Sequence, residues 1–140
     1  MKYMLMVLGK QADYDAMGGA ANSDSPAWSE ADLKAMFDYM GALNDDLAES
    51  GEWVDGQGLA DPRHARLVTA AADGSPVISD GPYGEAKEVL AGYWIVDVAD
   101  FDRAAEIAAR AYACPVPAGA PNYPVVVHPV DSRSGGTEMC

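Results

Sequence analysis

Charged side chains gather in a stretch of the chain that cannot be helical. Asp80 precedes Gly81 and Pro82, and this pair breaks a helix because Gly admits unusual φ values while Pro fixes φ and lacks a backbone N–H. Asp80 could act as a general base or electrostatic anchor, or it could accept hydrogen bonds from its own turn. Glu85 and Lys87 share a side of an extended loop. They could clamp a polar ligand, or form a solvated pair that contributes little.

Three further side chains are candidates for the same site. Tyr83 offers a ring for packing or a hydroxyl for a pocket. His128 lies in a strand-like run and titrates near neutral pH, so it is either an acid or base in a cleft or a packed histidine at its rim. Trp94 fills either the core or a cleft. The predicted site therefore has proton carriers, Asp80 and His128, and ligand-binding residues, Tyr83, Glu85, Lys87 and Trp94.

Motifs for metals and nucleotides are missing from the sequence. The two histidines, His64 and His128, belong to no H-x-x-x-H or H-x-x-E pattern, and Cys114 and Cys140 are too far apart for a usual zinc site. No G-x-G-x-x-G, P-loop or G-x-S-x-G is present. We expect no metal and no cofactor, with a weak oxygen-ligand site for Ca²⁺ or Mg²⁺ as the alternative.

Charge and hydropathy restrict the partners and the compartment. The net charge of −13, from 22 acidic and 9 basic residues, repels phosphate backbones, so we expect no direct nucleic-acid binding. No apolar run approaches the roughly 18 residues of a membrane span, and we expect no signal peptide. Cys140 is the last residue, so a structural disulfide is not expected and a reducing cytoplasm is the simpler compartment.

Hydrophobic periodicity and turn residues predict one domain over residues 1–130, followed by a flexible tail over 131–140. A mobile loop is expected over residues 9–27, which are rich in Gly, Ala, Asn and Asp. Ser29 and Gly51 bound the clearest helix, and Asp100 caps a second one that ends near Pro115. Asp73-Gly74 signals a hairpin. Strands are predicted over residues 3–8, 52–59, 66–71, 76–79, 92–98 and 124–130.

This order predicts an α+β fold, in which two split βαβ units form a ferredoxin-like sheet with an inserted β-hairpin and both helices on one face. The strands over residues 3–8, 93–98 and 125–130 are apolar at odd and even positions, although a sheet covered on one side should alternate. A second copy of the chain, packed sheet to sheet, is the economical cover for the other face. We therefore expect a homodimer of the dimeric α/β-barrel type.

The chain resembles the DGPF group of YCII-related proteins over nearly its whole length. The resemblance lies in Asp80-Gly81-Pro82-Tyr83, where Phe is usual in place of Tyr83, followed by Glu85 and Lys87-Glu88. It extends to Gly56-Gln57-Gly58-Leu59, Gly92-Tyr93 and Asp97-Val98. The family implies a dimeric α/β barrel. Some relatives use a His near the start of the first helix, but residues 28–33 contain none here, and His128 stands where Arg is common.

Two classes of function follow. In the first, the protein binds a small molecule in a dimer cleft, or is an accessory of sigma-factor-linked regulation, as the resemblance to DGPF proteins implies. In the second, it is a cofactor-independent lyase or isomerase with Asp80 and His128 as proton carriers. A perturbed pKa at either residue within a concave pocket would favour the enzyme.

Overall fold

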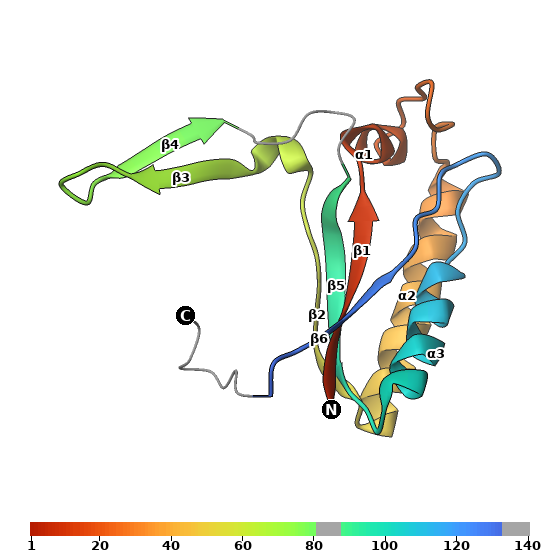
Figure 1. The fold of residues 1–140 in the computed structure, drawn as a ribbon. Coiled ribbons are helices and arrows are strands. Elements are labelled where there is room, and N and C mark those ends of the chain that lie inside the picture. The colour runs from red at the N-terminus through yellow and green to blue at the C-terminus, as the bar shows by residue number, and fades with distance from the viewer. Residues whose placement is uncertain (81–87, 133–140) are drawn as a thin grey trace.

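The computed structural model describes residues 1–80 and 88–132, and it has the predicted α+β class (Figure 1). The predicted loop residues 81–87 and tail residues 133–140 lie outside this described part. The elements follow in the order β1 (Lys2–Gly9), α1 (Gln11–Met17), α2 (Glu30–Ser50), β2 (Trp53–Gly58), the 3₁₀ turn η1 (Pro62–His64), β3 (Arg66–Ala70), β4 (Pro76–Asp80), β5 (Val89–Asp97), α3 (Phe101–Tyr112) and β6 (Val126–Pro129).

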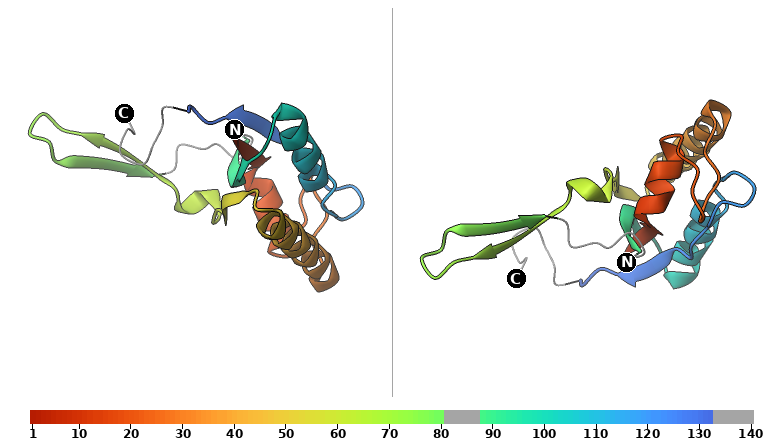
Figure 2. Two further views of the ribbon diagram at one scale, coloured as in Figure 1. Left: turned by 90° about the horizontal axis from the view of Figure 1, so that it is seen from below. Right: turned by 90° about the horizontal axis from the view of Figure 1, so that it is seen from above.

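Four strands form one antiparallel sheet in the order β2-β5-β1-β6, with α2 and α3 on one face of it (Figures 1 and 2). β5 begins three residues earlier than predicted and β6 two residues later. The predicted hairpin is a separate two-stranded sheet of β3 and β4. Gly74 in its turn has φ of 88°, which only glycine adopts readily.

The core lies between the sheet and the two long helices. Leu5 of β1 and Val96 of β5 are fully buried, and they belong to one cluster with Leu43 of α2 and Ile107 of α3. Successive strand residues point to opposite faces, so Met4 and Met6 point away from the helices. Residues that lie directly opposite each other on two paired antiparallel strands point to the same face of the sheet.

We call the sheet surface opposite α2 and α3 the open face. The register places Ile95, Met4 and His128 in one row across it, and Tyr93, Met6 and Val126 in the next. No helix of residues 1–80 or 88–132 covers this surface (Figure 2). The structure thus agrees with the sequence pattern, in which these strands are apolar on both sides.

Helix α2 has the predicted bounds, and its C-terminal half packs on the core. Ser29 caps it by accepting from Asp32 N–H at 3.1 Å, and Gly51 ends it with φ of 78°. Leu43 and Leu47 are buried, as their spacing predicts. Phe37 is 63% exposed, because α2 packs against the core cluster only from Met40 onward.

The prediction of a loop over residues 9–27 was wrong, because α1 lies within it. Asp13 Oδ2 accepts a hydrogen bond from Lys10 N–H at 2.8 Å and caps the first turn of the helix. Gly19, with φ of 102°, follows the last turn. Seven residues are too few to show a clear helical period, and an isolated helix of this length is unstable in water. Tertiary contacts of its buried Gln11 and Ala16 therefore stabilise it.

We predict that Gly56→Ala destabilises the fold by about 1–3 kcal/mol, because an added Cβ would lie 2.5 Å from Trp53 Cη2 and 3.2 Å from Trp94 Cδ1. Gly58→Ala on the same strand is the matched control, since an added Cβ there has no atom of the described residues within 4 Å. Urea unfolding checks both variants. Equal stability of Gly56→Ala and wild type would contradict this packing.

Candidate functional site

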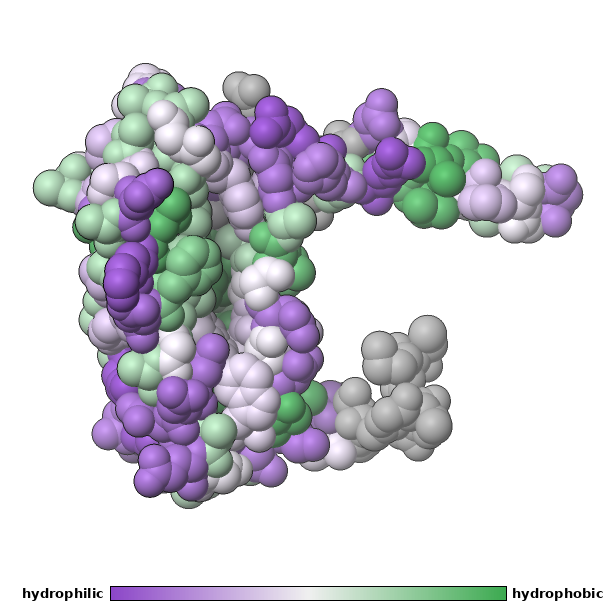
Figure 3. Space-filling view, turned by 180° about the vertical axis from the view of Figure 1, so that it is seen from behind, coloured by the Kyte–Doolittle hydropathy of each residue, from purple (hydrophilic) through white to green (hydrophobic). Residues whose placement is uncertain are grey.

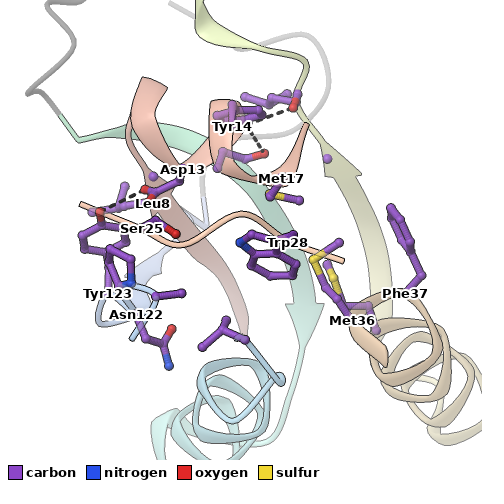
Figure 4. Close-up of a pocket in the computed structure, with 18 residues that line it drawn as sticks. Leu8, Asp13, Tyr14, Met17, Ser25, Trp28, Met36, Phe37, Asn122 and Tyr123 are labelled. Carbon is purple, nitrogen blue, oxygen red and sulfur yellow. Dashed lines mark hydrogen bonds between the residues drawn. The ribbon is translucent and has the colours of Figure 1, made fainter. Parts of the chain in front are cut away.

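A cavity of about 360 Å³ lies where β1 ends, between α1, the N-terminal half of α2 and the loop that follows α3 (Figure 4). Its volume falls in the usual range for small-molecule sites. Most of its lining is apolar, and large side chains reach it from five segments of the chain: Leu8, Met17, Trp28, Met36, Phe37, Met40 and Val116. Three of these are methionines, whose flexible side chains adapt to irregular ligands.

One wall of the cavity is polar. The Tyr123 hydroxyl donates to Asp13 Oδ2 at 2.9 Å, the same oxygen that accepts from Lys10 N–H (Figure 4). Burial, and then the hydrogen bond to Asp13, raise the pKa of Tyr123 well above its usual value. Tyr123 therefore stays protonated at neutral pH and is a poor proton donor. The pair Asp13–Tyr123 suits recognition of a polar group better than acid–base chemistry.

Tyr14 attaches α1 to the edge of the sheet beside this cavity. Its hydroxyl donates to the Leu59 carbonyl at 3.0 Å, and the Ala91 carbonyl lies 3.4 Å away. Burial first, and then the charges of Asp61 and Asp13, raise the pKa of Tyr14. The wall that α1 contributes is therefore fixed to the ends of β2 and β5.

A second polar network joins α1 to η1. The buried Gln11 amide donates to Asp15 at 3.0 Å and to Asp61 at 3.1 Å. Arg63 Nη2 lies 2.9 Å from Asp61 Oδ2 and 3.8 Å from Asp15 Oδ1. The hydrogen bond from Arg63 is the main reason why the pKa of Asp61 falls to about 2. The network fixes the position of the segment from which β3 emerges.

Trp94, a predicted ligand-binding residue, lies in the core and lines a smaller cavity of about 180 Å³. Its indole Nε1–H donates to Asn44 Oδ1 at 2.7 Å, so this donor already has a partner. The smaller cavity shares Met40, Gly58 and Ala91 with the larger one, so the two are neighbours along the edge of the sheet.

The predicted proton carriers lie in different sheets of the chain. Asp80 is the last residue of β4, exposed and opposite Arg66. His128 is on β6, exposed and opposite Met4 on the open face. Its Nδ1 lies 2.9 Å from the carbonyl oxygen of the next residue, Pro129. The predicted binding residues Tyr83, Glu85 and Lys87 lie outside the described residues.

A polar pair on the open face was not anticipated from sequence. The Tyr93 hydroxyl donates to Asp55 Oδ2 at 2.9 Å, and this hydrogen bond raises the pKa of Tyr93. The Asp55 carboxylate thus has a hydrogen-bond partner on this face, which also carries the polar side chains of Gln57 and His128.

Sequence reasoning also missed Asp13, Tyr14 and Tyr123. The first two lie in the segment predicted as a loop, and Tyr123 precedes the last strand without a recognisable motif. The spacing of Lys10 and Asp13 ahead of Gly18-Gly19 is the one signal that could have indicated a short capped helix.

Within residues 1–80 and 88–132, no three or more His, Cys, Asp or Glu side chains form a cluster suited to a metal ion. No helix in these ranges is long and apolar enough to cross a membrane.

We predict that Tyr123→Phe reduces the loss of stability at alkaline pH. A raised pKa in the folded state contributes stability that is fully present below the unfolded value near 10 and is lost as the pH rises above it. Melting temperatures of wild type and variant between about pH 8 and pH 11 check this. Parallel curves for the two proteins would contradict a protonated Tyr123 in contact with Asp13.

Comparison with known proteins places the chain among its relatives. The YCII-related domain matches residues 1–126. An uncharacterized protein of Rhizobium meliloti (strain 1021) is 28% identical over 86 residues, which cover 61% of this chain and 68% of that protein. This relative brings no activity to compare. Because the match to the domain spans most of the 140 residues, the chain belongs to the YCII-related family.

Proposed function

We propose that this YCII-related protein binds a small molecule in the cavity between α1, α2 and the loop after α3. The observation that carries the proposal is the lining of that cavity: apolar on most sides, with the pair Asp13–Tyr123 on one wall. Small-molecule sites typically combine such an apolar lining with a few fixed polar groups that set orientation.

The charges indicate the class of ligand. Asp13 places a carboxylate at the polar wall, and the chain carries a net charge of −13. Anionic ligands are therefore disfavoured. The Tyr123 hydroxyl has a lone pair with which to accept a hydrogen bond while it donates to Asp13. The ligand we propose is neutral or cationic, mostly apolar, and carries one hydrogen-bond donor such as an amine or hydroxyl.

We further propose a ferredoxin-like arrangement and a homodimer formed through the open face. The strand order β2-β5-β1-β6 and the position of α2 and α3 on one face support the first, with β3–β4 as the inserted hairpin. The rows of Met4 and Met6, apolar apart from His128, Gln57 and the pair Asp55–Tyr93, support the second. The family resemblance implies both features.

The alternative is a cofactor-independent lyase or isomerase with Asp80 and His128 as proton carriers. These two residues lie in separate sheets of one chain, and neither lines the two cavities described above, so we expect this alternative to need a second copy. A link to sigma-factor-dependent regulation has only the resemblance to DGPF proteins as support. The widely spaced Cys114 and Cys140 support our proposal of a cytoplasmic location.

A thermal-shift screen tests the binding proposal. We predict that neutral or cationic amphiphilic compounds raise the melting temperature in a concentration-dependent way, and that their anionic counterparts do not. For a compound that binds, Tyr123→Phe should weaken the affinity by roughly 3–10-fold, the equivalent of one lost hydrogen bond.

Tyr93→Phe is the matched control for this experiment. It removes a hydroxyl that also donates to a carboxylate, Asp55, but on the open face. Its affinity for the same compound should equal that of the wild type. Weaker binding by Tyr93→Phe with unchanged binding by Tyr123→Phe would move the ligand to the open face and refute the cavity as the site.

We predict that Met6→Asp weakens the homodimer without unfolding the chain, because it places an unpaired carboxylate in the middle of the open face. Met6→Leu, which conserves volume and hydrophobicity, should leave the dimer intact. Sedimentation velocity measures the assembly, and far-UV circular dichroism measures the fold. A folded Met6→Asp protein that dimerises as wild type does would exclude this interface.

A further inference from the structure

The hairpin of β3 and β4, residues 66–80, leaves its apolar side chains in water; we call it the arm. All ten of its strand residues are exposed. Val68 and Ile78 lie opposite each other and are 62% and 57% exposed, while Leu67 and Val77 on the other side are 48% and 49% exposed. An isolated two-stranded hairpin is at best marginally stable in water. The apolar side chains of the arm, visible in Figure 3, therefore require a cover.

The arm extends from the sheet on the side of the open face, away from α2 and α3 (Figures 1 and 2). Its root is held in place, because η1 contacts α1 through the Gln11–Asp61 hydrogen bond and the Arg63–Asp15 ion pair. The arm and the open face thus form two sides of one space, as Figure 3 shows from behind.

The dimensions of the arm indicate that one partner covers both surfaces. Five strand residues at about 3.3 Å each reach about 17 Å, whereas two packed sheets lie about 10 Å apart. A sheet packed on the open face at that distance would lie within the reach of the arm. The arm would extend past that sheet to the layer behind it.

The charges favour a second copy of this chain as that partner. Two chains of net charge −13 repel each other, so the surfaces through which they associate should carry little unpaired charge. On the open face the Asp55 carboxylate is hydrogen-bonded to Tyr93, and on the arm Arg66 and Asp80 are directly opposite each other. In a two-fold dimer each copy contributes one open face and one arm, so both surfaces are buried and the assembly closes.

We propose that the arm is exchanged between two copies and packs through its Val68–Ile78 side against the second copy. This inference deepens the homodimer proposed above and rests on it. It does not depend on the ligand cavity. The contact of the arm with the second copy contributes to the affinity of the dimer in addition to the sheet-to-sheet contact.

The test uses Val68→Asp combined with Ile78→Asp in the full chain. Because both substitutions occur twice in a symmetric dimer, sedimentation equilibrium should show dimerisation weakened by at least ~100-fold. Tyr112→Asp is the control: Tyr112 is 47% exposed at the end of α3, in the helix layer, and its substitution should not change dimerisation. Circular dichroism should report wild-type secondary structure for both, since the substituted arm residues are exposed in the single chain.

Comparison with Met6→Asp separates the two interfaces. If the arm variant dissociates while Met6→Asp still dimerises, the arm exchange stands and the sheet contact fails. If Met6→Asp dissociates while the arm variant dimerises as wild type does, the exchange is wrong and the sheet contact stands. Hydrogen exchange at a high and a low protein concentration gives a second readout: amides of residues 66–80 should be protected in the dimer and lose this protection on dilution. Equal exchange rates of these amides at the two concentrations would overturn the proposal.

Discussion

One constraint shapes the molecule: its four-stranded sheet is apolar on both faces, and one layer of long helices covers only one of them. The odd-numbered residues Tyr3 and Leu5 face α2 and α3 and are buried. The even-numbered Met4 and Met6 face the other way, in rows with Ile95 and Tyr93. Burial of apolar surface is the main favourable term in folding, so an arrangement that leaves this second face in water is incomplete. Both the proposed dimer and the proposed exchange of the arm follow from that.

The same helix layer also creates the cavity. Leu43 and Leu47, in the C-terminal half of α2, pack on the sheet. Nearer the N-terminus of the helix, Met36 and Met40 line the cavity, and Phe37 at its edge is exposed. α1 and the loop after α3 enclose the space from the other sides, and the hydrogen bond from Tyr123 to Asp13 joins them. A space between elements that do not pack directly on each other is a common place for a ligand.

The long elements were predictable because their signals are local. Ser29 and Gly51 define α2, Asp100 caps α3, and Gly74 marks the hairpin turn, each through the chemistry of one or two residues. The cavity was not predictable from such signals. Its polar wall joins residues 110 positions apart in sequence, and α1 depends on tertiary contacts that no short pattern reveals. Asp80 and His128 were predicted as proton carriers from their residue types, but residue type does not show whether two side chains lie close together in the fold.

We propose above that a second copy of the chain covers the open face. The most direct test is the mass of the unmodified protein in solution at micromolar concentration, measured by sedimentation equilibrium. A homodimer would give a single species of twice the 14.7 kDa chain mass. A stable, folded species of 14.7 kDa, with the open face and the arm both in water, would contradict it.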